Sequence, residues 1–199
     1  MTDKLKDEIQ INSAEYLFRK IKKTAKTKFN CEYRLNLHIR ISFWVINIVS
    51  FLLIFIGIID IIKQNNVNSN VITTLIYSIL ILVYSLMLKN SNNHNTVREM
   101  KVSGTELLHL ADRLQPYCNK EIEINLYNSF SNKYKNILLK TVENTKKIDY
   151  ELMKLDFKDY YKPKWKQIFV TKIKYYFGFF HYFFVLLLLI ITVVYFILH

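Results

Sequence analysis

Long uncharged stretches dominate the pattern of hydrophobic and polar positions in this chain. Residues 41–59, 64–88 and 175–199 contain no Asp, Glu, Lys or Arg, and the apolar part of the second stretch begins at residue 71. About 20 apolar residues in a helix, at about 1.5 Å each, span the hydrocarbon core of a bilayer. The pattern therefore predicts a membrane protein with a two-span helical hairpin, at about 41–62 and 71–88, and a third transmembrane helix at 175–199.

Between the uncharged stretches, apolar residues recur at every third or fourth position, which is the spacing of one helix face. The chain has 3 Gly and 2 Pro in 199 residues, so few positions interrupt helices. We therefore expect an all-α fold. A basic amphipathic helix over residues 1–40 precedes the first span, and a domain of long helices occupies residues 89–174.

Within residues 1–40, the amphipathic helix is predicted to start at Asn12, which can cap it, and Glu15 three residues later completes a capping box. Its apolar stripe consists of Phe18, Ile21, Ala25, Phe29, Tyr33, Leu37, Ile41 and Trp44, and its opposite face carries Lys20, Lys23 and Lys26. Two interpretations stay open. The stripe packs against the helices of residues 89–174, or it lies at the anionic surface of the inner leaflet.

Two helices are predicted within residues 89–174. The first covers about 97–115, directs Val102, Leu107, Leu110, Ala111 and Leu114 inward, and ends at Pro116. The second covers about 124–157 and, if unbroken, is about 50 Å long. A helix of that length needs partners for its apolar stripe. We therefore expect it to mediate self-association in the manner of a coiled coil, through Phe130, Tyr134, Leu138 and Leu152.

The net charge of +12 is spread unevenly and predicts an orientation in the membrane. Basic residues crowd before the first span and before the third, whereas the link between the first two spans contains only Lys63. Because Lys and Arg near spans stay on the cytoplasmic side, we expect a multi-pass protein of the cell membrane. Its N-terminus and residues 89–174 face the cytoplasm, and its C-terminus, His199, lies outside.

Small and polar residues inside the first two spans are the candidate pore-facing positions. They are Asn47, Ser50, Gly57, Thr74, Ser78 and Ser85. Such residues let helices approach closely and form hydrogen bonds across an interface. The alternative is that they line a water-filled path in an oligomer. Asp60, at the outer end of the first span, is expected to mark a boundary, and the aromatic residues over 175–184 are expected to anchor the third span at the headgroups.

The sequence contains none of the motifs that carry common enzyme chemistry. There is no glycine-rich phosphate loop, no H-E-x-x-H, no G-x-S-x-G and no C-x-x-C pair. Cys31 and Cys118 are expected to be ordinary thiols in a reducing compartment. We therefore expect no catalytic residues, no metal site, no cofactor and no specific nucleic acid binding, because topology already explains where the basic residues cluster.

Two stretches of the chain resemble the SLATT family, whose members are bacterial two-span effectors found with nucleotide-signalling and other defence modules. Residues 25–35, Ala-Lys-Thr-Lys-Phe-Asn-Cys-Glu-Tyr-Arg-Leu, are similar to the family's basic approach to its first span. Residues 134–138 and 143–150 are similar to its cytoplasmic helix and its late polar motif, which here holds Glu143, Asn144, Asp149 and Tyr150. Thr145 stands where members commonly carry a histidine.

The resemblance implies a homo-oligomeric membrane effector of an antiphage or conflict system. An infection signal, or a partner protein that makes or senses a nucleotide, would activate it to form a pore or disrupt the inner membrane, as in abortive infection. The competing hypothesis is a passive membrane anchor or scaffold that recruits a soluble partner to its basic cytoplasmic face. Toxicity on expression separates the two.

Overall fold

The computed structural model describes residues 2–63, 93–118, 120, 122–141 and 145–198, together with 75–76, 78–79, 81–83 and 85; the side chains of 2–12, 59–63, 93 and 195–198 lie outside the description. The elements are α1 Thr2–Lys63, α3 Asn93–Leu114, η1 Gln115–Tyr117, α4 Ile124–Lys140, α5 Lys147–Asp156, α6 Lys158–Tyr161, α7 Trp165–Phe177 and α8 Phe180–Leu198. The all-α fold is confirmed for these residues.

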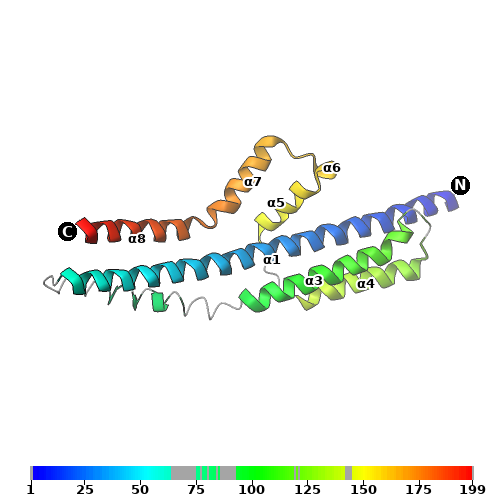
Figure 1. Cartoon of the computed structure of the whole chain (residues 1–199). Coiled ribbons are helices and arrows are strands. Elements are labelled where there is room, and N and C mark those ends of the chain that lie inside the picture. Colours follow the sequence, from blue (N-terminus) through cyan, green and yellow to red (C-terminus); the bar gives the residue numbers. More distant parts are fainter. Residues whose placement is uncertain are drawn as a thin grey trace. The chain divides into compact units, whose positions relative to one another are not determined.

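The chain divides into two compact units (Figure 1). Unit 1 comprises Met1–Leu35 and His94–Lys172, and unit 2 comprises Asn36–Asn93 and Ile173–His199. The helix α1 supplies residues to both units and begins at Thr2, so the predicted start at Asn12 is wrong. A capping box is only a local signal, and here the helix continues on its N-terminal side.

The core of unit 1 forms where α3 and α4 lie along the N-terminal part of α1 (Figure 1). From α1, Ile21 and Ala25 are completely buried, and from α3 so are Leu107 and Leu114. Removing such side chains from water is the main favourable term for this packing, at roughly 25 cal/mol per Å² of apolar surface. The amphipathic segment of α1 therefore packs against the other helices, the first of the two interpretations given above.

The buried face of α1 differs from the predicted stripe. Tyr33 is 63% exposed and Trp44 is 66% exposed, whereas Cys31 is completely buried. The reason is geometric: each step of four residues turns a helix by about 400°, so a stripe built from repeated steps of four drifts by about 40° per step. Two such steps beyond Ala25 carry Tyr33 out of the core.

The predicted helix before Pro116 is present as α3, which ends in η1 around that proline. One of its predicted inward residues is wrong, because Val102 is 49% exposed while Met100 is completely buried. Gly104 lies against α1, since a Cβ there would sit 3.0 Å from the ring of Phe29. The absence of a side chain lets the two helices approach at this level.

The predicted single helix over 124–157 is wrong, because α4 ends at Lys140 and α5 begins at Lys147. Thr141 turns the backbone to an extended conformation, and its hydroxyl donates to the carbonyl oxygens of Ile137, at 3.3 Å, and Leu138, at 3.2 Å. These bonds satisfy acceptors that the last turn of a helix leaves without partners.

The apolar stripe of α4 is used within the chain. Phe130 and Tyr134 are buried in the core of unit 1, and Leu138 packs at its edge. The argument that this stripe lacks partner surface is therefore wrong. Self-association through Phe130, Tyr134, Leu138 and the half-buried Leu152 of α5 stays a prediction without that support.

Unit 2 is built around one face of α1 and the helix α8. From α1 the buried residues are Val45, Val49, Leu53 and Ile56, and from α8 they are Tyr182 and Leu189. The phenol of Tyr182 lies 2.6 Å from Ser42 Oγ and 3.3 Å from His38 Nδ1, and His38 stacks on Phe179 with centroids 4.2 Å apart. Tyr182, expected to serve as a headgroup anchor, is instead a buried, hydrogen-bonded contact.

The predicted helix over 175–199 has a break that the sequence analysis did not include. The helices α7 and α8 are bent by 52° relative to each other, and the backbone turns at Gly178 and Phe179. The 19 residues of α8 reach about 28 Å at 1.5 Å per residue, close to the thickness of a hydrocarbon core, about 30 Å.

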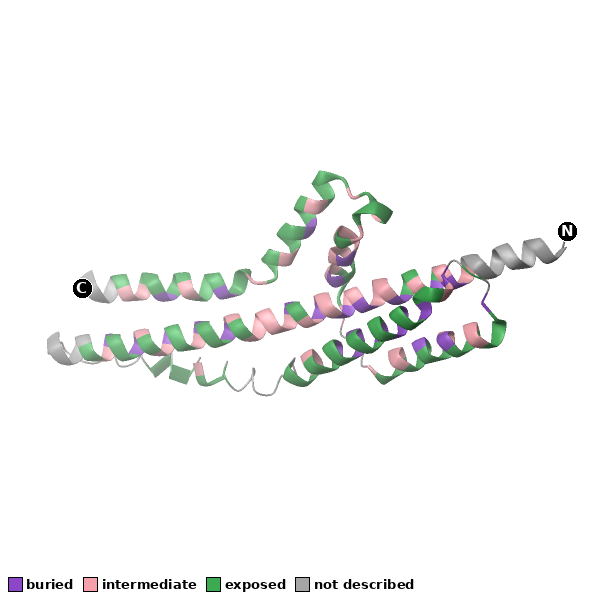
Figure 2. Cartoon of the chain, turned by 45° about the vertical axis from the view of Figure 1, so that its right-hand side comes forward, coloured by how far each residue is buried: buried purple, intermediate pink, exposed green. Residues whose placement is uncertain are grey.

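Within the described part of the chain, one helix is long and apolar enough to cross a bilayer, Ser13–Ile58, and the bent pair α7 and α8 passes the same test when taken together. The predicted second span at 71–88 lies largely outside the described residues. Large apolar residues are exposed on the unit 2 part of α1 and on α8, and Figure 2 shows exposed segments along both of these helices; they include Phe51, Ile54, Phe183, Ile190 and Ile191.

Candidate functional site

A buried ion pair joins α1 to α5 within unit 1. Arg34 donates from Nε to Asp149 Oδ1 at 2.8 Å and from Nη2 to Asp149 Oδ2 at 2.9 Å. The Arg34 side chain is 6% exposed and the Asp149 side chain is completely buried. The paired geometry matches the planar guanidinium to the carboxylate, which is the strongest arrangement for this kind of contact.

Asp149 also organises the start of α5. Its Oδ2 accepts the backbone N–H of Lys146 at 2.8 Å, and its own N–H donates to the Lys146 carbonyl at 3.0 Å. From α1, the Asn30 amide donates to the Asp149 carbonyl at 3.1 Å. A carboxylate in the first turn is favoured by the partial positive charge of a helix N-terminus. One residue therefore caps α5 and fastens it to α1.

The environment of the pair shifts the pKa of its neighbours. Burial alone would lower the pKa of Arg34, but the hydrogen bond with Asp149 and its negative charge outweigh that effect and raise it. Burial, followed by the charge of Asp149, raises the pKa of Cys31 to about 11. Burial likewise raises the pKa of Cys118. Both thiols are therefore protonated near neutral pH.

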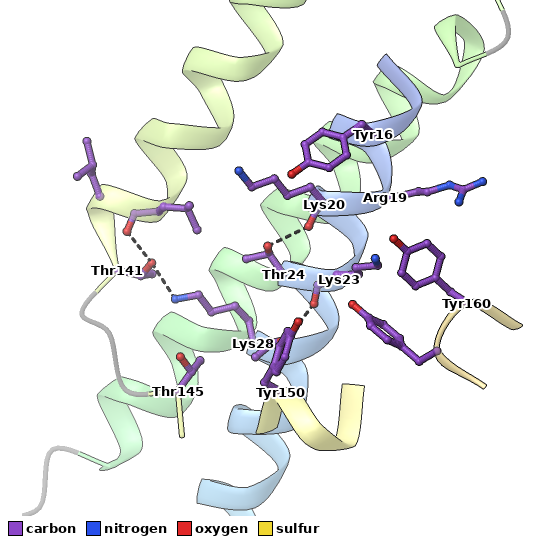
Figure 3. A pocket seen from close by; sticks show the side chains of 14 residues that line it. Tyr16, Arg19, Lys20, Lys23, Thr24, Lys28, Thr141, Thr145, Tyr150 and Tyr160 are labelled. Carbon is purple, nitrogen blue, oxygen red and sulfur yellow. Dashed lines mark hydrogen bonds between the residues drawn. The ribbon is translucent and has the colours of Figure 1, made fainter. Parts of the chain in front are cut away.

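Beside this pair, unit 1 contains a cavity of about 740 Å³ (Figure 3). The side chains that line it are mainly basic, phenolic or hydroxylic. The cations are Arg19, Lys20, Lys23 and Lys28, and the phenols are Tyr16, Tyr150, Tyr160 and Tyr161. Thr24, Thr27, Thr141 and Thr145 add hydroxyls. The described lining contains no carboxylate, so the cavity presents positive charge.

Two lysines of the cavity, Lys20 and Lys23, lie over aromatic rings. Lys23 Nζ lies 3.5 Å from the ring centroid of Tyr160 and 4.8 Å from that of Tyr161, and Lys20 Nζ lies 5.6 Å from that of Tyr134. Cation–π contacts of this kind orient an ammonium without neutralising it. Arg19 differs, because it pairs with Glu15 one turn earlier on α1.

The far wall of the cavity comes from α5 and α6. A hydrogen bond with Tyr161, together with burial, raises the pKa of Tyr150, and the rings of Tyr160 and Tyr161 meet edge to face with centroids 4.9 Å apart. On the side of α4, Lys28 Nζ donates to Thr141 Oγ1 at 3.2 Å (Figure 3). The wall thus consists of phenols and hydroxyls linked to one another.

The structure brings together the two stretches that carried the family resemblance. Residues 25–35 supply Arg34, and residues 143–150 supply Asp149, which is its partner, and Tyr150, which lines the cavity. Glu143 and Asn144 lie outside the described residues. Sequence reasoning missed the pair because it assigned Arg34 to membrane orientation. Apolar spacing gave no signal for it, because Arg34 comes nine residues after Ala25 and therefore lies about 180° around α1 from that buried residue.

Of the candidate pore-facing residues, Asn47 lies away from the buried face of α1 in unit 2. Asn47 is exposed and donates to the Phe43 carbonyl at 3.0 Å. It stands two residues from Val45 and from Val49, about 200° around the helix from that buried face. Its neighbours Ser50 and Gly57 are half-buried, Ser78 and Ser85 are exposed, and Thr74 lies outside the described residues.

One comparison with known proteins identifies a family. The family model described as SMODS and SLOG-associating 2TM effector domain family 5 matches residues 11–196, nearly the whole chain. Searches of the curated proteins and of the solved structures found no match.

Unit 1 should be sensitive to the loss of either single partner of the buried pair. Breaking a buried pair by removing one partner leaves an uncompensated charge and costs about 3–5 kcal/mol, whereas replacing both by apolar groups is often nearly neutral. We expect Arg34→Met or Asp149→Leu to lower the Tm of the detergent-solubilised chain strongly, and the double variant to recover most of the loss. Circular dichroism at about 222 nm, where α-helices give a strong negative band, follows the unfolding transition.

A matched control joins the same two helices at the surface. Lys26 and Asp156 pair at 3.2 Å with side chains 42% and 49% exposed, and exposed pairs contribute about 0–1 kcal/mol. Lys26→Met with Asp156→Leu should leave the Tm nearly unchanged. If the single variants of the buried pair behave like this control, the pair does not hold unit 1 together.

The thiol of Cys31 should react slowly. With a pKa of about 11 in place of 9.0, its thiolate fraction at a pH near 8 falls about a hundredfold. In a Cys118→Ser background, iodoacetamide should label Cys31 at a rate at least that much lower in the folded chain than in denaturant. Asp149→Asn should speed labelling, because it removes a negative charge that disfavours the thiolate. Equal rates in folded and denatured chain would contradict this environment.

Proposed function

The chain belongs to family 5 of the SMODS and SLOG-associating 2TM effector domains, and on that basis we propose that it permeabilises the inner membrane of a bacterium as the effector of an antiphage or conflict system. In this proposal the protein assembles into a homo-oligomer after an infection signal or a nucleotide-linked partner activates it. The outcome is a pore or a local disruption of the bilayer that stops growth.

The observation that carries the membrane part of the proposal is the exposed surface of unit 2. Phe51 is 70% exposed, Ile54 64% and Phe183 60%. Burying such side chains in lipid is favourable by roughly 0.3–0.6 kcal/mol each on an insertion scale. Water offers no comparable environment for a row of large apolar residues on two neighbouring helices. Lipid therefore covers these faces.

An oligomer is needed because one chain offers too few helices to enclose a water path. Every backbone group in the hydrocarbon must be satisfied inside helices, so a path can be lined only by side chains from several spans. The polar face that carries Asn47 and the exposed Ser85 suits that lining, since neither belongs to the core of unit 2. The competing function, a passive anchor, requires no such face.

Topology is part of the proposal. We place unit 1 in the cytoplasm, three spans in the membrane and the C-terminus outside, because Lys and Arg crowd before residue 41 and before residue 175. The bent pair α7 and α8 fits this arrangement if α8 crosses and the basic α7 stays at the inner surface.

The topology predicts opposite signals from the two ends of the chain. Alkaline phosphatase fused after residue 198 should be active, because the enzyme folds only outside the cytoplasm, while a fusion after residue 120 should be inactive. Green fluorescent protein fused at the same points should give the reverse pattern. An inactive phosphatase after residue 198 would place that end in the cytoplasm and leave two spans.

The pore predicts a separation between polar and apolar positions. Asn47→Leu with Ser85→Leu makes this stretch of the path uniformly apolar, which favours a dewetted constriction. We expect normal membrane insertion and assembly, with loss of toxicity and of membrane depolarisation measured by a potential-sensitive dye. Ile48→Leu with Val83→Leu, at neighbouring positions that are already apolar, is the matched control and should keep both.

Two outcomes would count against this function. Equal depolarisation by the polar double variant and its control would reject these faces as the conducting path. Absence of both toxicity and depolarisation in the unchanged, overexpressed chain with its activating system present would favour the anchor.

A further inference from the structure

The cavity of unit 1 combines a basic lining with a cluster of phenols. Its described lining carries four cations and no carboxylate, and four of its side chains are phenols. Its volume of about 740 Å³ falls within the range of small-molecule sites, roughly 300–1,000 Å³. Surface lysines normally alternate with acidic residues, so this local excess of one sign needs an explanation.

The charge points to an anion. Lys20 and Lys23 project from one turn of α1, and their ammonium groups contact aromatic rings, which hold them in place without cancelling their charge. Lys28 lies two turns further along α1 and is 6% exposed, so it lines the floor of the cavity. An ammonium group binds phosphate oxygens as a point charge, so that, unlike a planar guanidinium, it does not require the phosphate to approach in one plane.

The phenols point to a planar ring beside that anion. Tyr16 is 66% exposed and Tyr160 is 56% exposed. They reach the cavity from different elements, α1 and α6 (Figure 3). Nucleobases stack on tyrosine rings for about 1–3 kcal/mol per base. A lining with basic residues alone would suit inorganic phosphate; the exposed rings extend the preference to a nucleotide.

We propose that this cavity binds a nucleotide, with its phosphates on Lys20, Lys23 and Lys28 and its base against Tyr16 or Tyr160. Such a ligand contacts α1 on one side and the α5–α6 segment on the other, so it fastens the same two parts of unit 1 that Arg34 and Asp149 join. Nucleotide binding itself does not depend on the effector function. The further step, that the nucleotide activates the effector, rests on that proposed function.

Binding is tested on the full chain in detergent by isothermal titration calorimetry, with ATP, adenosine and inorganic tripolyphosphate as probes. We expect ATP to bind, tripolyphosphate to bind more weakly, and adenosine to bind at least about tenfold more weakly than ATP, since a charge-assisted hydrogen bond corresponds to about a tenfold change or more in Kd. Adenosine binding as tightly as ATP, or no binding of ATP at millimolar concentration, would overturn the proposal.

Variants locate the site. Lys23→Gln should raise the Kd for ATP about tenfold, and Lys20→Gln serves as a second variant of the same kind. Lys22→Gln is the matched control: it removes the same charge at the preceding position of α1, where Lys22 Nζ lies over the Phe18 ring, outside the cavity lining. Equal losses in Lys22→Gln and Lys23→Gln would show attraction by overall charge and would reject the site.

A second pair of variants separates a nucleotide from a phosphate headgroup. Tyr16→Leu should weaken ATP about fivefold or more by loss of stacking and leave tripolyphosphate unchanged; Tyr33→Leu, at an equally exposed tyrosine of α1 outside the cavity, should change neither. Vesicles of phosphatidylcholine, alone and mixed equally with phosphatidylglycerol, supply the lipid arm. Binding to the anionic vesicles that depends on Lys23, with no effect of Tyr16→Leu on ATP, would assign the cavity to a lipid headgroup instead.

The two proposals fail separately. Loss of ATP binding in Lys23→Gln with unchanged depolarisation in cells would support the nucleotide site but reject its role as a switch. Depolarisation that disappears in Asn47→Leu with Ser85→Leu, while ATP binding persists, would support the pore independently of the cavity.

Discussion

Unit 1 depends on the bidentate contact between Arg34 and Asp149. A buried guanidinium and a buried carboxylate each lose several kcal/mol of hydration, so each tolerates its position only with the other in place. Their two hydrogen bonds, at 2.8 and 2.9 Å, fix both the rotation of α1 and the register of α5. Apolar residues would fill the same space, but they would allow several orientations of α5 against α1. The bidentate ionic contact allows one.

That constraint explains why the chain from Thr141 onward folds back on α1. Sequence periodicity predicted one helix through this region, because residues 141–146 contain no Gly or Pro and the apolar spacing continues across them. At the break, two local bonds are made: the Thr141 hydroxyl donates to the Leu138 carbonyl at the end of α4, and the Asp149 carboxylate accepts the Lys146 N–H at the start of α5. Apolar spacing shows neither bond, because both join polar groups, and the contact that holds the start of α5 against α1, Arg34 with Asp149, joins residues 115 positions apart.

What the sequence did predict follows from burial. The all-α class, α3 with its end at Pro116, and the packing of the amphipathic segment all come from apolar residues at helical spacing. The errors occur where helical spacing alone does not determine which residues face the neighbouring helices. Val102 matched the spacing yet is exposed, and Tyr33 drifted off the buried face. In unit 2, Tyr182 looked like one more interfacial aromatic, and its bond to Ser42 at 2.6 Å becomes visible only when α8 lies against α1.

The basic residues of α1 show most clearly why charge alone does not reveal function. Counting them together predicts membrane orientation, and every one contributes equally to that count. In the folded chain these residues have different surroundings. Arg34 is buried against a carboxylate, Lys26 holds Asp156 at the surface, and Lys20 and Lys23 stand at a cavity among tyrosines. A charge that only orients a protein in the membrane can remain in water. These side chains are instead held against particular partners, at a cost in side-chain entropy that orientation does not require. For Lys20 and Lys23, the nucleotide proposed above would supply the opposite charge that offsets this cost.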